Sequence, residues 1–262
     1  MRQLRENFTE ICIILMMLFS CTGKIVAQEQ SEMEQYIQEF FIGETVFTQE
    51  RKEFQVTLKP AFAGRRDLQQ LSVPLELEYG ISDRWQLSVE MPYLFSFAKE
   101  LETKRGIGEA ELSLMYALIK HNRLLSVSVG ASVPFHTTSS DFKNDDEVVF
   151  ESFARIGRQF ERVQVHGYLA IEFTRTDMML NYGLSAMINL GHLNATLEMT
   201  AAKEEQIYYQ ISPGLIWHHS EGFEFGLAVC KGLSAPGQWG VTGMLTWELF
   251  IARNRKMSRA NG

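Results

Sequence analysis

Cysteine is nearly absent beyond the first 27 residues. Cys12 and Cys21 lie inside that stretch, and Cys230 stands alone in the remainder of the 262-residue chain. A single cysteine cannot form an internal disulfide, and neither CxxC nor a zinc-type spacing occurs. The sequence therefore predicts no disulfide framework, no metal and no cofactor, and Cys230 is interpreted as a small packing residue.

Long apolar runs and concentrated positive charge are also missing. After the N-terminus no run of about 18 apolar residues occurs, which argues against membrane-spanning helices but not against membrane-spanning strands, whose signal per segment is much weaker. The 25 Lys and Arg and the 32 Asp and Glu are scattered, for a net charge of −7. Because a basic patch is absent, nucleic acid is not expected as a partner.

The first 27 residues resemble an export signal. Arg2 and Arg5 precede the apolar stretch ICIILMMLFS, and small residues offer a cleavage point after Ala27. The apolar run is too short for an anchor helix, which needs roughly 20 residues. A lipoprotein signal is the alternative, because LFSC ending at Cys21 resembles a bacterial lipobox, although Phe19 is unusual at its position.

The rest of the chain shows strand after strand and no dividing linker. In WQLSVEMPYLF (85–95) apolar and polar residues alternate with a period of two, which indicates an extended chain. We expect an acidic periplasmic lead-in at 28–52, one all-β domain at 53–250 and a polar tail at 251–262. Turn residues bound twelve predicted strands, at 53–62, 68–79, 85–95, 108–119, 124–135, 148–158, 163–174, 180–190, 193–200, 206–217, 223–232 and 239–250.

The connections decide whether the apolar faces meet a protein core or lipid. The links after even-numbered strands are short, as in GISDR (80–84), whereas SFAKELETKRGI (96–107) and HTTSSDFKNDDE (136–147) follow odd-numbered strands. A single transmembrane antiparallel β-barrel with both termini in the periplasm predicts this sorting, and a soluble sandwich does not. Aromatic residues on the apolar faces also fit a girdle at the lipid headgroups, formed by Trp85, Tyr93, Tyr116, Trp217, Trp239 and Trp247.

The polar faces would then line the lumen of the barrel. The sequence favours a hydrated or salt-bridged interior there over an ion-selective or catalytic group of residues. Arg155 and His166 are the clearest inward bases. The complete set of lumen candidates is Glu76, Glu78, Glu90, Glu109, Glu111, Glu151, Arg155, His166, Glu172 and Glu198.

One part of the chain resembles a known family. In LELEYGISDRWQLSVEMPY (75–93) a strand ending in Glu-Tyr-Gly leads through a tight Asp-Arg turn to a strand ending in Pro-Tyr, and GIGEAELSLMYAL (106–118) opens the next strand. This stretch resembles the outer-membrane barrels grouped with the meta-pathway of phenol degradation, although Glu109 stands where Asp is usual. The resemblance implies an outer-membrane location and uptake of apolar or aromatic compounds, and it supplies no catalytic residues.

The favoured function is a passive channel or transporter for small molecules, apolar or aromatic ones included, in the outer membrane of a Gram-negative cell. Its expected partners are outer-membrane lipid, a small apolar solute and the barrel-assembly machinery. The first alternative is a structural or interaction barrel with a plugged lumen. The second is a lipid-modifying enzyme built on His136, TTSS (137–140) and Asp141, but those residues are adjacent in one loop, whereas a triad is assembled from separate segments.

Overall fold

The computed structural model describes residues 33–65, 68–98, 103–120, 122–135, 137–142, 148–175, 177–203, 207–220, 222–234 and 237–250. The predicted signal at 1–27 and the predicted tail at 251–262 lie outside these residues. The described elements are β1 (Glu53–Leu58), β2 (Ala61–Arg65), β3 (Leu68–Gly80), β4 (Trp85–Ala98), β5 (Lys104–Ile107), β6 (Ala110–Ile119), β7 (Ser126–Phe135), the single-turn helix η1 (Ser140–Phe142), β8 (Val148–Phe160), β9 (Val163–Thr174), β10 (Met178–Asn189), β11 (Leu193–Lys203), β12 (Ile207–Ser220), β13 (Phe223–Gly232) and β14 (Trp239–Phe250).

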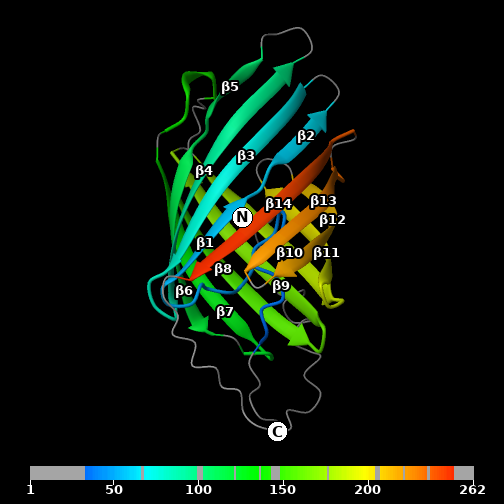
Figure 1. The fold of residues 1–262 in the computed structure, drawn as a ribbon. Coiled ribbons are helices and arrows are strands. Elements are labelled where there is room, and N and C mark those ends of the chain that lie inside the picture. The colour runs from blue at the N-terminus through cyan, green and yellow to red at the C-terminus, as the bar shows by residue number, and fades with distance from the viewer. Residues whose placement is uncertain are drawn as a thin grey trace, which may run out of the picture. The chain divides into compact units, whose positions relative to one another are not determined.

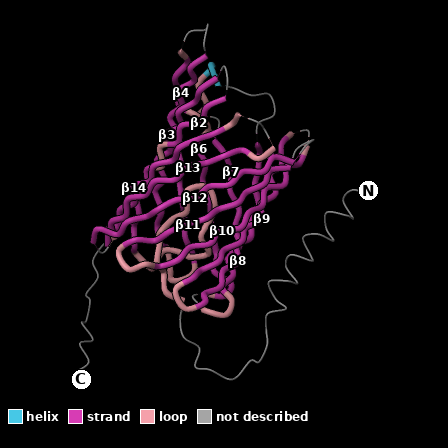
Figure 2. Tube along the Cα trace, turned by 90° about the vertical axis from the view of Figure 1, so that its right-hand side faces the viewer, coloured by secondary structure: helices cyan, strands magenta, loops and turns pink. Residues whose placement is uncertain are grey.

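These strands form one closed antiparallel barrel (Figures 1 and 2). β1 and β2 make one crossing, interrupted at Pro60, which has no amide hydrogen for the ladder. β5 and β6 make another, interrupted at Gly108. β14 pairs with β1 and β2, which closes the sheet. The described strands therefore make twelve crossings, and the predicted 12-strand barrel is confirmed.

The outer surface of the barrel is apolar, as the alternation predicts. Along β4, Trp85, Val89 and Met91 are exposed on the outside, whereas the intervening Gln86 is buried inside. Large exposed apolar side chains recur on the other strands, for example Leu184, Leu197 and Leu215. An apolar surface that continues around a barrel matches the hydrocarbon of a bilayer. No helix among the described residues is long and apolar enough to cross a membrane.

The two ends of the barrel differ less in link length than the sequence predicts. We call one end the short-turn end; its links between strands are 81–84, 120–125, 161–162, 190–192 and 221–222. We call the other end the long-loop end, and its longest link is 136–147. The predicted loop at 96–107 is wrong in part, because β4 continues to Ala98 and pairs with β5. Cross-strand pairing extends that hairpin beyond the predicted strands.

The orientation of the barrel is testable. The short-turn end should face the periplasm and the long-loop end the outside of the cell. A peptide tag inserted at Thr138 should therefore be labelled on intact cells, and the same tag inserted at Asn122 should be labelled only after the outer membrane is permeabilised. The opposite pattern of labelling would reverse the topology.

The segment before β1 is not a periplasmic lead-in. The described part of that segment, residues 33–52, lies inside the barrel in its short-turn half, apart from the exposed turn at 50–52, and we call it the plug (Figures 1 and 2). Ile37 and Phe40 of the plug are fully buried. The prediction is wrong because the acidic composition of 28–52 conceals apolar side chains that need a buried environment.

Candidate functional site

The plug has no helix or strand, so its backbone N–H groups need partners from the lumen wall. The N–H groups of Phe41, Ile42 and Gly43 donate to the Glu198 carboxylate, at 3.1, 2.8 and 2.6 Å. The Glu198 side chain projects from β11 and is 0% exposed. A single lumen carboxylate thus holds one turn of the plug, with charge-assisted hydrogen bonds.

Other wall residues hold the remainder of the plug. The N–H of Gln38 donates to both carboxylate oxygens of Glu224 at 3.1 Å. The N–H of Val46 donates to His166 Nδ1 at 3.2 Å, and the N–H of Gln49 donates to Gln86 Oε1 at 2.8 Å. These partners come from β13, β9 and β4, so the plug is attached around the whole lumen.

The apolar side of the plug fits the wall closely. Phe40 and Ile37 pack in a buried cluster with Phe41, Met187, Ile216, Ala228 and Met244. Phe41 lies where Gly214 and Gly226 leave room, since a Cβ atom on those residues would come within 2.4 and 2.7 Å of its ring. Full burial of a large apolar side chain is worth about 1.5–3 kcal/mol, so this contact stabilises the plug in place.

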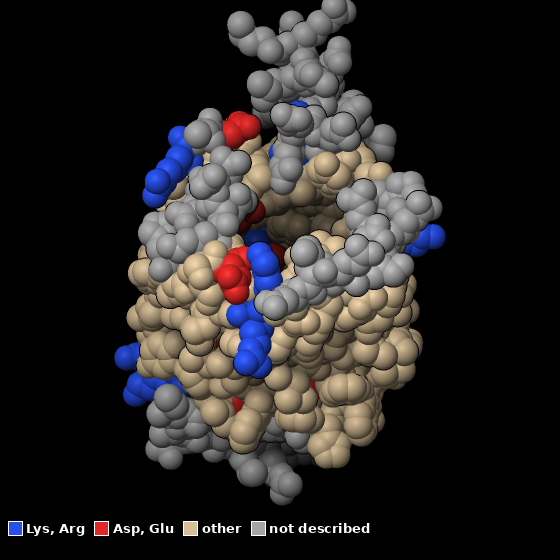
Figure 3. Space-filling view, turned by 90° about the horizontal axis from the view of Figure 1, so that it is seen from above, with Lys and Arg blue, Asp and Glu red and all other residues tan. Residues whose placement is uncertain are grey.

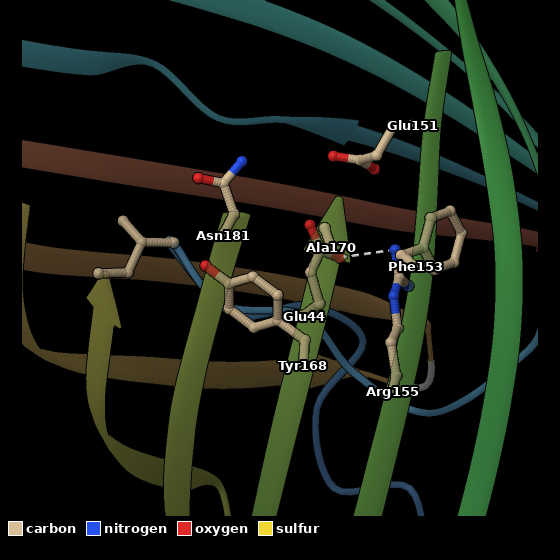
Figure 4. Close-up of a pocket in the computed structure, with 8 residues that line it drawn as sticks. Glu44, Glu151, Phe153, Arg155, Tyr168, Ala170 and Asn181 are labelled. Atoms are coloured by element: carbon tan, nitrogen blue, oxygen red, sulfur yellow. Dashed lines mark ion pairs between the residues drawn. The ribbon is translucent and has the colours of Figure 1, made fainter. Parts of the chain in front are cut away.

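A cavity of about 200 Å³ lies between the plug and the long-loop end (Figure 4). The guanidinium of Arg155 pairs with Glu44 of the plug at 3.1 Å and lies 4.5 Å above the ring of Phe153. Viewed from the long-loop end, the barrel is hollowed, and acidic and basic side chains are visible inside (Figure 3). The cavity lining is Ile42, Glu44, Glu151, Phe153, Arg155, Tyr168, Ala170 and Asn181.

Glutamates on neighbouring strands stand side by side above the plug. Glu90 is the register partner of both Glu76 and Glu111, and Glu151 is the partner of Glu172. We call these five residues the acidic belt. Like charges placed opposite one another on a sheet are destabilising unless a cation or a proton lies between them.

Two basic side chains at this level are paired with plug carboxylates. Lys59 Nζ lies 3.2 Å from Glu39 and 3.9 Å from Glu76, while Arg155 pairs with Glu44. The plug therefore brings two acids of its own to the belt. Glu39 and Glu44 therefore balance the positive charges of Lys59 and Arg155, and the belt glutamates come in addition to these two carboxylates.

The structure divides the ten lumen candidates into groups. Glu78, His166 and Glu198 contact the plug, and Glu78 accepts hydrogen bonds from Gln49 and Gln86. Glu151 and Arg155 line the cavity, and the other candidates on strands, Glu76, Glu90, Glu111 and Glu172, complete the belt.

Glu109 differs from the other candidates because it sits at the break between β5 and β6, in neither strand. The sequence analysis missed several functional residues, among them Glu224 of the wall, Glu44 of the plug, and Tyr168 and Asn181 of the cavity. Glu224 alternates with Phe223 and Phe225 and carries the same signal as the chosen glutamates.

The six aromatic candidates lie on the outer face. Trp85, Trp217 and Trp247 are exposed near the short-turn end, where Tyr116 packs against Trp85 with ring centroids 4.6 Å apart. Trp239, also exposed, begins β14 at the long-loop end. Tyr93 is exposed near the middle of β4 instead of at a strand end.

The candidate enzyme loop makes structural hydrogen bonds. The Thr137 hydroxyl accepts from the N–H of Ala110 and donates to the carbonyl of Gly108, and the Ser139 hydroxyl accepts from the N–H of Ile107. Asp141 lies in η1, and His136 lies outside the described residues. The described hydroxyls thus dock the loop on the β5–β6 crossing. Among the described residues, no group of three or more His, Cys, Asp or Glu side chains could hold a metal ion.

No protein-family model and no curated protein matches the sequence. Solved structures do match. The KdgM porin aligns with a TM-score of 0.54 and 12% sequence identity, over 73% of this chain and 98% of its own. A second structure of that porin, in complex with disordered oligogalacturonate, aligns with a TM-score of 0.55 and 12% identity, over 74% of this chain and 98% of its own. The NanC porin aligns with a TM-score of 0.53 and 9% identity, over 74% of this chain and 100% of its own. At such identities the similarity extends to the barrel fold alone.

Proposed function

We propose that this protein is an outer-membrane channel for small molecules that enter from the long-loop end and meet a plug at the short-turn end. One observation carries the proposal: a barrel with an apolar outer surface encloses a polar cavity that is separated from the short-turn end by a non-covalently held segment of its own chain. A purely structural barrel has no need of a cavity above its plug. The signal at 1–27 would direct export, with cleavage after Ala27.

The size of the cavity limits the solute. Pockets for drug-sized ligands occupy about 300–1,000 Å³, and this one is smaller, so a molecule of roughly one ring fits best. The resemblance to the phenol-pathway barrels favours aromatic solutes, and Phe153 and Tyr168 supply aromatic walls. Lipid modification is not proposed, because the Thr137 and Ser139 hydroxyls of the candidate loop are engaged with backbone groups.

Bilayer conductance tests the proposal. Mature protein, extracted from the outer-membrane fraction or refolded, should produce discrete single-channel steps in a planar bilayer. The steps should be small and brief because the plug fills the short-turn half of the lumen. A preparation that is folded, as judged by heat-modifiable gel mobility, and yet gives no steps under any voltage would contradict the channel and favour a plugged scaffold.

A further inference from the structure

The walls of the cavity are fixed in place by glycines of neighbouring strands. A Cβ atom on Gly183 would lie 2.3 Å from the Tyr168 ring, and one on Gly130 would lie 2.2 Å from the Phe153 ring. Both rings therefore pack directly over the backbone of a glycine. Glycine in a strand weakens it, and a common reason for its presence is such a close approach. The cavity is thus bounded by two preorganised aromatic rings.

Polar groups converge on the same space from three strands. Figure 4 shows the Glu151 carboxylate and the Asn181 amide directed toward each other across the upper part of the cavity, with the Tyr168 hydroxyl below Asn181. Arg155 is turned toward Glu44, with which it pairs. In the described structure Glu151 has no such basic partner, and its register neighbour Glu172 carries the same charge.

A ligand in the cavity therefore meets more acidic than basic groups. Lys59 and Arg155 are matched by Glu39 and Glu44 of the plug. Glu90, Glu111 and Glu151 of the belt add carboxylates, which give a negative field where they are ionised. Low-dielectric walls focus such a field and concentrate counter-ions at the site. The face of an aromatic ring attracts cations as well, and Tyr168 offers such a face, whereas that of Phe153 is covered by Arg155.

We propose that the cavity above the plug binds small organic ammonium ions, with the ammonium group at Glu151 and the apolar body of the ligand against Tyr168. This inference rests on the proposed function for the route by which a ligand enters, and it names the class of molecule that the site selects. It extends the expectation of aromatic solutes by assigning them a positive charge.

Three probes of one size separate charge from shape. Benzylammonium, benzyl alcohol and benzoate share a single ring and differ in the group attached to it. Titration calorimetry on the refolded full-length mature protein in detergent should give benzylammonium an affinity about tenfold above that of benzyl alcohol, and benzoate should be weakest. Equal affinity for benzylammonium and benzyl alcohol would overturn the proposal in favour of neutral aromatics, and tightest binding of benzoate would overturn it in favour of an anion site at Arg155.

Matched variants locate the effect. Glu151→Gln should lower the affinity for benzylammonium about tenfold more than the affinity for benzyl alcohol, because it removes the charge and keeps the shape. Tyr168→Leu is a second variant, which should weaken binding of both probes by removing the ring. Asp83→Asn removes one negative charge from the exposed β3–β4 link and should change neither affinity.

The calorimetry tests the cation site, whereas the conductance measurement tests the channel, so the two proposals can fail independently. Binding of benzylammonium by a protein that never conducts would disprove the channel and keep the cation site. Conductance without preference for benzylammonium would keep the channel and disprove the cation site.

Discussion

Deletion of residues 33–47 is expected to convert brief, small conductance steps into a large and steady conductance. The deleted residues include the apolar cluster around Phe40 and the turn held by Glu198. Residues 48–52 remain, because the N–H of Lys52 donates to the carbonyl of Gly80 at the start of the barrel. The deletion exposes the polar side chains of Glu198, His166 and Glu224 in the lumen, so water can fill the space that the plug leaves.

A point variant gives an independent test of the same idea. Glu198→Ala removes the acceptor of three backbone N–H groups, and hydrogen bonds to a charged group are worth about 1.5–3 kcal/mol each. The plug should leave the lumen part of the time, which would appear as longer openings and as cleavage of the plug by added protease. Asn181→Ala changes a lumen residue that does not hold the plug and serves as the control.

A conductance in the deletion variant equal to that of the full chain would show that the plug does not obstruct the pore.

The second prediction contrasts two arginines on one strand. Leu184 is exposed on the outer face of β10 near its middle, whereas Asn181 faces the cavity. Leu184→Arg should reduce the free energy of folding into a bilayer by about 2–4 kcal/mol, the cost of an arginine in hydrocarbon at the midplane. Asn181→Arg should cost far less, because its charge meets water and the carboxylates of Glu151 and Glu172.

Urea titrations of both variants in lipid vesicles measure this difference. Heat-modifiable mobility on a gel supplies the control for correct folding before each titration. A larger loss for Asn181→Arg than for Leu184→Arg would mean that the register is displaced by one residue, because such a displacement exchanges every inward and outward side chain. Equal losses would mean that a charge at Asn181 is no better solvated than a charge in the lipid.

The period-two alternation predicts the faces of the strands but not what fills the lumen. Gln86 and Glu198 are inward and polar, as expected, and both are buried against the plug. A wall residue that faces water and one that accepts a hydrogen bond from a plug are both polar. Composition alone therefore cannot separate a hydrated lumen from a plugged one.

Another pattern in the sequence does mark the plugged half. Met187 lies between Ala186 and Ile188, and Ile216 lies between Leu215 and Trp217, so apolar residues occupy both faces of β10 and β12 near the short-turn end. Strands buried on both faces show continuous apolar runs. With the glycines opposite Phe41, these interruptions of the alternation indicate an object inside the barrel. Which part of the chain supplies it depends on long-range contacts that local periods do not encode.

The origin of the plug at the beginning of the chain constrains the order of assembly. Its partners Gln159, His166, Glu198 and Glu224 lie between 120 and 186 residues further along the sequence. The segment therefore lacks most of its binding surface until β8–β13 exist. High contact order makes such steps slow.

The seam between β1 and β14 completes the cylinder, and the plug is joined directly to β1. A chain that closes this seam early would leave Phe40 and Phe41 outside in water, as a misfolded species. After the seam has closed, the N-terminal segment can enter only through the short-turn end, so enclosure is simplest while the wall is still open.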